Sequence, residues 1–197
     1  MLATGIILAG GKSSRFKSNK AMVKISSQRL IDRIIDVLAE VFYEIILVTN
    51  TPDQYNALGI RTVTDIIPGK GPLSGMHAGL ICSSHDLNFV TACDIPFINK
   101  DILRYLLDQT GICDDAVVPI VEGYPEPLAA VYRKTCIKPI EDALINNQYK
   151  VKSVYPHIRI KYLAEQELQH FGGPMSFFNI NTQDDLRIAL EQLKEKQ

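Results

Sequence analysis

The sequence predicts an α/β fold in which helices cover both faces of a mostly parallel sheet, and three observations support it. The chain has 197 residues, of which 46% are hydrophobic, so it can bury the core of one domain. Apolar runs typical of strands alternate with amphipathic segments typical of helices. Neither an internal repeat nor a low-complexity linker divides the chain. We therefore expect a single three-layer, Rossmann-like domain spanning residues 1–197.

In the first half of the chain, each element has a local signal. Strands are expected where short, β-prone apolar runs occur, at residues 4–9, 44–49, 61–64 and 88–93. Helices are predicted between and after them, at residues 29–41, Pro52–Leu58, 73–84 and 100–109. An apolar stripe runs along the first of these helices, at Ile31, Ile34, Ile35 and Leu38. Pro52 suits the first turn of a short helix, and Asn99 suits the N-cap of the last one.

The second half is less regular and introduces antiparallel pairing. Strands are predicted at Ala116–Val121 and 128–132, and the short link between them suits an antiparallel pair. Helices are predicted at residues 134–145 and 183–194. Thr182 has the residue type of an N-cap, and Asp185 follows it at the spacing of a capping box. The sheet is therefore expected to be mixed, although mostly parallel.

The first strand ends in a segment suited to phosphate binding. Residues 8–20 read LAGGKSSRFKSNK, which combines glycines, hydroxyl side chains and spaced cations. Glycine lets backbone N–H groups approach an anion closely. Arg15 can hold phosphate oxygens with a bidentate guanidinium, and Lys20 adds a compact charge. A tight turn alone would explain two glycines, but the whole pattern favours a nucleotide site.

Several classes of protein are excluded by spacing and composition. Neither the dinucleotide fingerprint Gly-x-Gly-x-x-Gly nor the P-loop Gly-x4-Gly-Lys-Ser/Thr is present. A net charge of −1 gives no general attraction to nucleic acid or anionic membranes, and the apolar runs are too short to span a bilayer. The four cysteines are expected to be buried thiols in a reducing cytoplasm, and the scattered histidines do not predict a zinc site.

Polar residues follow the predicted strands at the edge where open α/β sheets bind ligands. Asp94 directly follows the strand at residues 88–93, and Mg²⁺ at nucleotide phosphates is held by one or two carboxylates. Beside the glycine loop we favour this metal role over a turn aspartate bonded to nearby backbone. Asp65 follows the strand at residues 61–64, where it could cap a turn before Pro68. Asn50 is interpreted as a cap of the Pro52–Leu58 helix rather than a base contact.

Several motifs together resemble those of the MobA-like nucleotidyltransferases that modify the molybdenum cofactor, the guanylyltransferases above all. Residues 8–20 resemble the signature LAGGxSxRMGxxK, with Phe16 and Lys17 where the family has methionine and glycine. Because a non-glycine residue resists positive φ, Lys17 is a departure that affects the loop. Further similar segments are GPLSG at residues 71–75, CDIP at 93–96, PLAAVY at 127–132 and FNINTQDDL at 178–186.

The resemblance implies a nucleotidyltransferase fold and an enzyme that transfers GMP from GTP to the terminal phosphate of Mo-molybdopterin. The N-terminal half would bind the nucleotide and the C-terminal half the pterin acceptor. It implies catalytic roles for Arg15, Lys20 and Asp94, with Mg²⁺ as cofactor on Asp94. It implies GTP contacts for Leu8, Ala9, Gly10, Lys20, Asp65 and Asp94. The pterin would contact Asn179 and Asn181, whose amides both donate and accept.

Three alternatives stay open beside this hypothesis. Cytidylyl transfer to the same pterin is a sister activity, whose enzymes more often carry alanine where Gly10 stands. Sugar-phosphate nucleotidyltransferases share the opening loop but are usually longer. A non-catalytic GTP-binding accessory module would keep the loop without needing Asp94. We expect a cytoplasmic monomer, with other proteins of molybdenum cofactor biosynthesis and apo-molybdoenzymes as partners and without nucleic acid or membrane binding.

Overall fold

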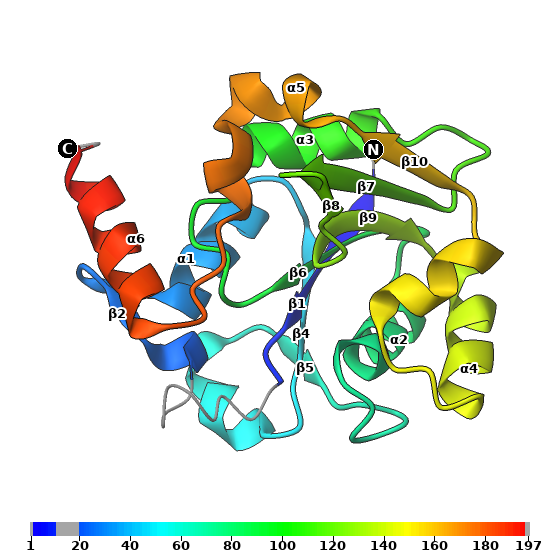
Figure 1. Ribbon diagram of the computed structural model, residues 1–197. Coiled ribbons are helices and arrows are strands. Elements are labelled where there is room, and N and C mark those ends of the chain that lie inside the picture. Colours follow the sequence, from blue (N-terminus) through cyan, green and yellow to red (C-terminus); the bar gives the residue numbers. More distant parts are fainter. Residues whose placement is uncertain (1, 11–19, 196–197) are drawn as a thin grey trace.

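The computed structural model describes residues 2–10 and 20–195, and Figure 1 shows a central sheet between helices. Within these residues eight strands form the main sheet, in the order β10-β7-β9-β6-β1-β4-β5 with β8 beside β7. Their bounds are β1 Ala3–Leu8, β4 Glu44–Val48, β5 Arg61–Val63, β6 Leu87–Ala92, β7 Ala116–Val121, β8 Tyr124–Pro125, β9 Ala129–Arg133 and β10 Ile160–Leu163. Only the pairs that involve β8 or β9 are antiparallel in this sheet. The predicted mixed, mostly parallel α/β sheet is confirmed.

Helices cover both faces of the sheet because successive strand residues point to opposite sides. On one face α2 (Pro72–Cys82) and α4 (Ile137–Ile145) pack with the buried Ile6 and Ile46. The other face carries α1 (Leu30–Ala39), α3 (Lys100–Asp108) and α5 (Glu165–Leu168), packed with Ile7 and Leu47. The last helix, α6 (Gln183–Glu195), packs outside these layers against the hairpin of β2 (Lys24–Ile25) and β3 (Gln28–Arg29).

Short 3-10 helices connect these elements, and several depart from the predicted pattern. Their bounds are η1 Lys20–Met22, η2 Pro52–Leu58, η3 Lys134–Cys136, η4 Val151–His157, η5 Gln169–Phe171 and η6 Gly173–Phe177. The predicted helix at residues 134–145 is therefore η3 followed by α4. The helix predicted from residue 29 begins at Leu30, because Arg29 pairs with Lys24 in the β2–β3 hairpin.

Two predicted helix caps are confirmed. The side chain of Asn99 accepts hydrogen bonds from the backbone N–H groups of Asp101 and Ile102, at 3.1 and 3.0 Å. At the start of α6 the Asp185 N–H donates to the Thr182 hydroxyl at 3.1 Å, while the Asp185 carboxylate accepts from the Thr182 N–H at 2.8 Å. This is the reciprocal capping box that the spacing predicts.

Two further expectations concern membrane-spanning helices and the burial of the cysteines. None of the helices in the described part of the chain is long and apolar enough to cross a membrane. The cysteines are free thiols, of which Cys136 is buried and Cys82 and Cys93 are partly buried. Cys113 is exposed, so the expectation that every cysteine is buried is wrong. It lies in the loop after α3, where the chain turns at the surface before β7.

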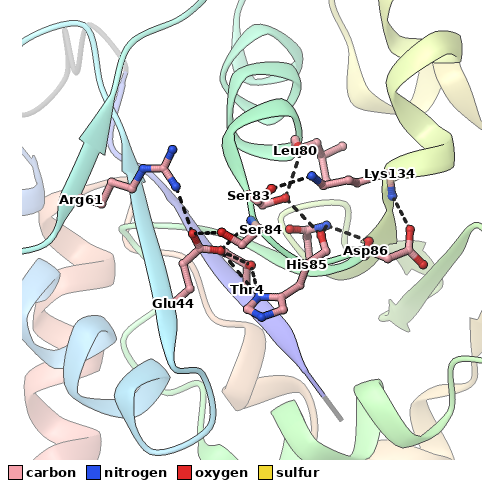
Figure 2. A network of polar contacts seen from close by, with 10 residues as sticks. Thr4, Glu44, Arg61, Leu80, Ser83, Ser84, His85, Asp86 and Lys134 are labelled. Atoms are coloured by element: carbon pink, nitrogen blue, oxygen red, sulfur yellow. Dashed lines mark hydrogen bonds and ion pairs between the residues drawn. The ribbon is translucent and has the colours of Figure 1, made fainter.

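At the amino-terminal end of the parallel strands, Glu44 is the centre of a polar network (Figure 2). Its carboxylate accepts hydrogen bonds from the Thr4 hydroxyl at 2.6 Å and from the N–H and hydroxyl of Ser84 at 2.8 and 2.9 Å. Arg61 forms an ion pair with it at 3.0 Å. Burial opposes ionisation, but these donors outweigh it and lower the pKa of Glu44 to about 2 from 4.5.

Replacement of Glu44 with glutamine is expected to lower the free energy of unfolding at pH 7 by about 1–3 kcal/mol, since bonds to a charged acceptor are lost. A depressed native pKa contributes stability that is present above pH 4.5 and is lost as the pH falls toward about 2. In the Glu44→Gln variant this fall of the free energy of unfolding with falling pH should be absent, as measured by urea unfolding between pH 2 and 7. The control is Glu40→Gln, which alters an exposed ion pair: the side chain of Glu40 is 51% exposed and that of its partner Lys100 is 45% exposed. This variant should lower the free energy of unfolding by less than about 0.5 kcal/mol.

Candidate active site

The carboxyl ends of β1, β4, β5 and β6 meet at one edge of the sheet, opposite the Glu44 network. The Ala9 N–H donates to the Val48 carbonyl at 2.9 Å, and the Cys93 N–H donates to the Leu8 carbonyl at 3.2 Å. Gly10, Asn50, Asp65 and Asp94 follow these strand ends. The prediction that these four residues lie at one edge of the sheet is therefore borne out by the strand registers.

A cluster of three polar side chains lies at this edge. The Lys20 ammonium forms an ion pair with Asp94 Oδ2 at 2.6 Å and donates to Asn181 Oδ1 at 2.9 Å. The Lys20 and Asp94 side chains are only 14% and 17% exposed. A backbone hydrogen bond also joins two of these segments, because the Ile180 N–H donates to the Asp94 carbonyl at 3.0 Å. Three segments far apart in sequence, after β1, β6 and η6, thus share one site.

The second carboxylate oxygen of Asp94 has a different environment. Asp94 Oδ1 is buried and has no hydrogen-bond partner among the residues that the structure describes. Buried polar atoms are normally satisfied, so this oxygen is suited to a ligand or cation that binds with the substrate. Residues 2–10 and 20–195 contain no group of three or more His, Cys, Asp or Glu that could hold a metal. One carboxylate fits Mg²⁺, which usually takes its other ligands from substrate phosphates and water.

Asn50 and Asp65 form a second pair at the edge, across β4 and β5. The Asn50 amide donates to Asp65 Oδ2 at 2.8 Å, and its carbonyl oxygen accepts from the Asp65 N–H at 3.2 Å. The interpretation of Asn50 as a helix cap is therefore wrong: Thr51 is the N-cap residue of η2, and its side chain makes no capping hydrogen bond. Both ends of the Asn50 amide bond to Asp65, two residues after β5, so Asn50 orients Asp65.

Asp65 also lies close to the first turns of α2. A Cβ built on Gly75 would lie 3.5 Å from Asp65 Oδ1 and 3.3 Å from Leu8 Cδ2. The absence of a side chain at Gly75 therefore lets α2 approach both residues closely. This brings the predicted nucleotide contacts Leu8 and Asp65 to the same part of the edge, and it gives the GPLSG segment a packing role there.

The two asparagines predicted to bind the pterin differ in their contacts. Asn179 donates to the Phe177 carbonyl at 3.0 Å, whereas Asn181 accepts from Lys20. Sequence reasoning missed the Lys20–Asn181 contact, since the two residues are 161 positions apart and no local pattern links them. The Asp185 carboxylate accepts from the Asn181 N–H at 2.8 Å and so fixes the backbone beside this contact.

A nucleophilic side chain is not part of the described site. Burial raises the pKa of Cys93 to about 12, so the residue before Asp94 remains a neutral thiol. Among the residues predicted to act in the site, Arg15 lies outside the described residues, as does Lys17. What the described edge offers is a cation, an unsatisfied carboxylate oxygen and amide groups, which suit the binding of phosphates rather than covalent catalysis.

Comparison with known proteins agrees with this geometry. Residues 5–160 match the MobA-like NTP transferase domain. The chain belongs to this family. It is 41% identical over 185 residues to a probable molybdenum cofactor guanylyltransferase of Pelotomaculum thermopropionicum, covering 93% of this chain and 90% of that one. A molybdenum cofactor guanylyltransferase of Desulfosudis oleivorans is 37% identical, covering 97% of this chain and 96% of that one.

A solved structure extends the similarity from sequence to fold. Molybdopterin-guanine dinucleotide biosynthesis protein A from Archaeoglobus fulgidus superposes with a TM-score of 0.85 at 27% identity, covering 98% of this chain and 99% of that one. A 2-C-methyl-D-erythritol 4-phosphate cytidylyltransferase from Thermus thermophilus, at 14% identity and a TM-score of 0.74, shares the fold alone. The nucleotidyltransferase fold and the MobA-like resemblance predicted from the sequence are thus confirmed.

Proposed function

We propose that this protein transfers GMP from GTP to the terminal phosphate of Mo-molybdopterin, which forms the guanine dinucleotide cofactor and releases pyrophosphate. The observation that carries the proposal is the contact of Lys20 with both Asp94 and Asn181, at 2.6 and 2.9 Å. This cluster joins the glycine-loop edge to the C-terminal segment. Curated guanylyltransferases that align with nearly the whole chain support the choice of guanylyl transfer.

In this proposal the two halves of the domain divide the substrates. The segment from Leu8 to Gly10 and Asp65 would contact GTP, because they lie at the carboxyl ends of β1 and β5. Asn179 and Asn181 would contact the pterin acceptor, because they lie in the motif that precedes α6, where Asn181 accepts from Lys20 beside Asp94. Lys20 stands between the two sets and is suited to the phosphates on which the reaction takes place.

In the proposed reaction the protein acts by positioning the two substrates and stabilising charge. A terminal phosphate oxygen of the acceptor attacks the α-phosphorus of GTP, the bond from that phosphorus to the bridging oxygen breaks, and pyrophosphate leaves. Lys20 and Arg15 would hold phosphate oxygens and stabilise the charge that develops on them. Mg²⁺, bound through Asp94, would supply further charge stabilisation at the phosphates. A protein nucleophile is not required.

Product analysis tests the proposed function. The full chain is incubated with molybdopterin and Mg²⁺ and with GTP, CTP, ATP or UTP in turn, and products are separated by mass. The guanine dinucleotide and equimolar pyrophosphate are expected with GTP. A cytosine dinucleotide would replace the proposal with the cytidylyl alternative. GTP binding without any product would instead indicate the accessory module.

GTP is expected to be preferred because Gly10 leaves room for guanine against the loop backbone. Among the described residues, a Cβ built on Gly10 meets nothing within 4 Å, so Gly10→Ala should fold normally and act only through the bound base. Each unpaired polar group of a displaced base costs about 1–3 kcal/mol, which is roughly ten- to a hundredfold in kcat/KM. The variant should therefore lose more kcat/KM with GTP than with CTP. An equal loss for both nucleotides would show that Gly10 does not read the base.

The proposal also covers the compartment, the oligomeric state and the partner proteins. We place the reaction in the cytoplasm, where a monomer would meet the other proteins of molybdenum cofactor biosynthesis and the apo-molybdoenzymes that receive the product. Sedimentation of the purified chain tests the monomer, and a dimer at micromolar concentration would contradict it.

A further inference from the structure

A turn at residues 126–129 lies at the same sheet edge as Asp94. The Ala129 N–H donates to the Glu126 carbonyl at 3.3 Å and closes the turn, while the Ala92 N–H donates to the Leu128 carbonyl at 3.3 Å. Ala92 is the last residue of β6, two positions before Asp94. Because β9 lies on the opposite side of β6 from β1, β4 and β5, the turn lies across β6 from the strand ends proposed to bind GTP (Figure 1).

The position of the turn is fixed from two directions. The Glu126 N–H donates to the Pro119 carbonyl of β7 at 2.9 Å. In addition, the hydroxyl of the fully buried Tyr132 donates to the Pro127 carbonyl at 2.9 Å and contacts the Tyr155 hydroxyl at 3.3 Å. Neighbouring strands lie about 4.8 Å apart. The turn therefore lies about that distance from the end of β6, the strand that precedes Asp94.

Glu126 is partly buried, and within residues 2–10 and 20–195 its carboxylate forms no hydrogen bond or ion pair. Burial raises the pKa of Glu126, the charge of Lys152 opposes this, and the charge of Glu122 adds to it. A partly desolvated carboxylate without donors is less stable than one that accepts hydrogen bonds. Glu126 is therefore suited to a ligand that brings N–H donors to this part of the sheet edge.

We propose that Glu126 binds the aminopyrimidinone edge of the pterin, an inference that rests on the proposed function. In that edge the 2-amino group and the neighbouring ring N–H are two parallel donors, which match the two oxygens of a carboxylate. Guanine presents the same pair of donors, but GTP is proposed to lie across β1, β4 and β5. The fixed turn would hold Glu126 ready for the pterin, so that selection of the acceptor depends on a side chain beyond Asn179 and Asn181.

Replacement of Glu126 with glutamine should raise the KM for molybdopterin about ten- to a hundredfold and leave the KM for GTP within twofold, because one acceptor becomes a donor that faces a donor. Glu40→Gln is the matched control, since Glu40 is an exposed carboxylate outside this hairpin and pairs with Lys100. Binding of molybdopterin alone, followed by its pterin fluorescence without GTP or metal, should weaken by the same factor in Glu126→Gln only. Circular dichroism and thermal unfolding verify that both variants fold.

The outcomes separate this inference from the proposed function. If the wild-type chain makes no dinucleotide from any nucleotide, the proposed function fails first. If it does, and Glu126→Gln binds molybdopterin like the wild type, the inference is wrong and the function stands. A rise in the KM for GTP alone would assign Glu126 to guanine and also overturn it. Pterin should compete with molybdopterin better than lumazine, whose 2-oxo group offers the carboxylate an acceptor instead of an amino donor.

Discussion

Replacing Asp94 with alanine is expected to reduce pyrophosphate release by a factor of about a thousand or more while the protein stays folded. Asp94 follows β6 at the active-site edge, pairs with Lys20 through Oδ2 and leaves a buried, unsatisfied Oδ1. Loss of this carboxylate removes the proposed metal ligand and leaves the Lys20 ammonium without its counter-charge. Each effect costs several kcal/mol in the transition state, and about 1.4 kcal/mol is a factor of ten in rate.

The measurement is continuous pyrophosphate release with GTP and molybdopterin, at saturating concentrations of both. Asp94→Asn keeps the size of the side chain and should lose nearly as much rate as alanine, which separates charge from packing. Asp101→Asn is the control, because Asp101 is an exposed aspartate on α3 that pairs with Arg104. Activity of Asp94→Ala within a few-fold of wild type would show that the carboxylate takes no part in the reaction.

Replacing Lys20 with alanine is expected to lower kcat/KM by about a hundred- to a thousandfold. The Lys20 side chain is 14% exposed and its ammonium donates to Asp94 and Asn181, so it is already held where the substrate phosphates would meet. Lys20→Arg should recover only part of the loss, since a planar guanidinium cannot replace a compact ammonium between two close oxygens. Steady-state kinetics with each substrate varied in turn provide the measurement.

A lysine close by provides the comparison for this second prediction. Lys24 is exposed on β2, four residues after Lys20, and makes no part of the described site. Lys24→Ala should keep kcat/KM within twofold, and so should Lys17→Ala if the signature aligns as the sequence suggests. Equal losses for Lys20 and Lys17 would mean that the register of the loop has been misread.

Hydrophobic periodicity predicted most of the fold because the long elements repeat their pattern several times. The strand β1 and the helix α1 are examples, each with one clear apolar face or run. The hairpin of β2 and β3 was missed, since strands of two residues are too short to show alternation. The edge strand β10 was missed for a related reason: Ile160–Leu163 has four residues and includes a lysine. The strand order also depends on long-range pairing, which no local pattern encodes.

The site was predicted in its parts but not in its contacts. Asp94 and Asp65 could be proposed because a strand end followed by a carboxylate is a local signal, reinforced by family motifs. The link from Lys20 to Asn181 and the pairing of Asn50 with Asp65 arise only when the strands align. The misreading of Asn50 shows the limit, because capping and cross-strand pairing both suit an asparagine beside a short helix.

The contact of Lys20 with both Asp94 and Asn181 has a thermodynamic consequence for the two substrates. An ammonium has three N–H groups, and two of them are engaged across residues that belong to opposite halves of the chain. A phosphate that draws Lys20 toward itself therefore changes what Asn181 can offer to the acceptor. Free-energy linkage requires the reverse effect to be equal, so whatever factor GTP applies to molybdopterin affinity, molybdopterin applies to GTP. Lys20 would then make the two binding events cooperative, in either sign, without a moving domain.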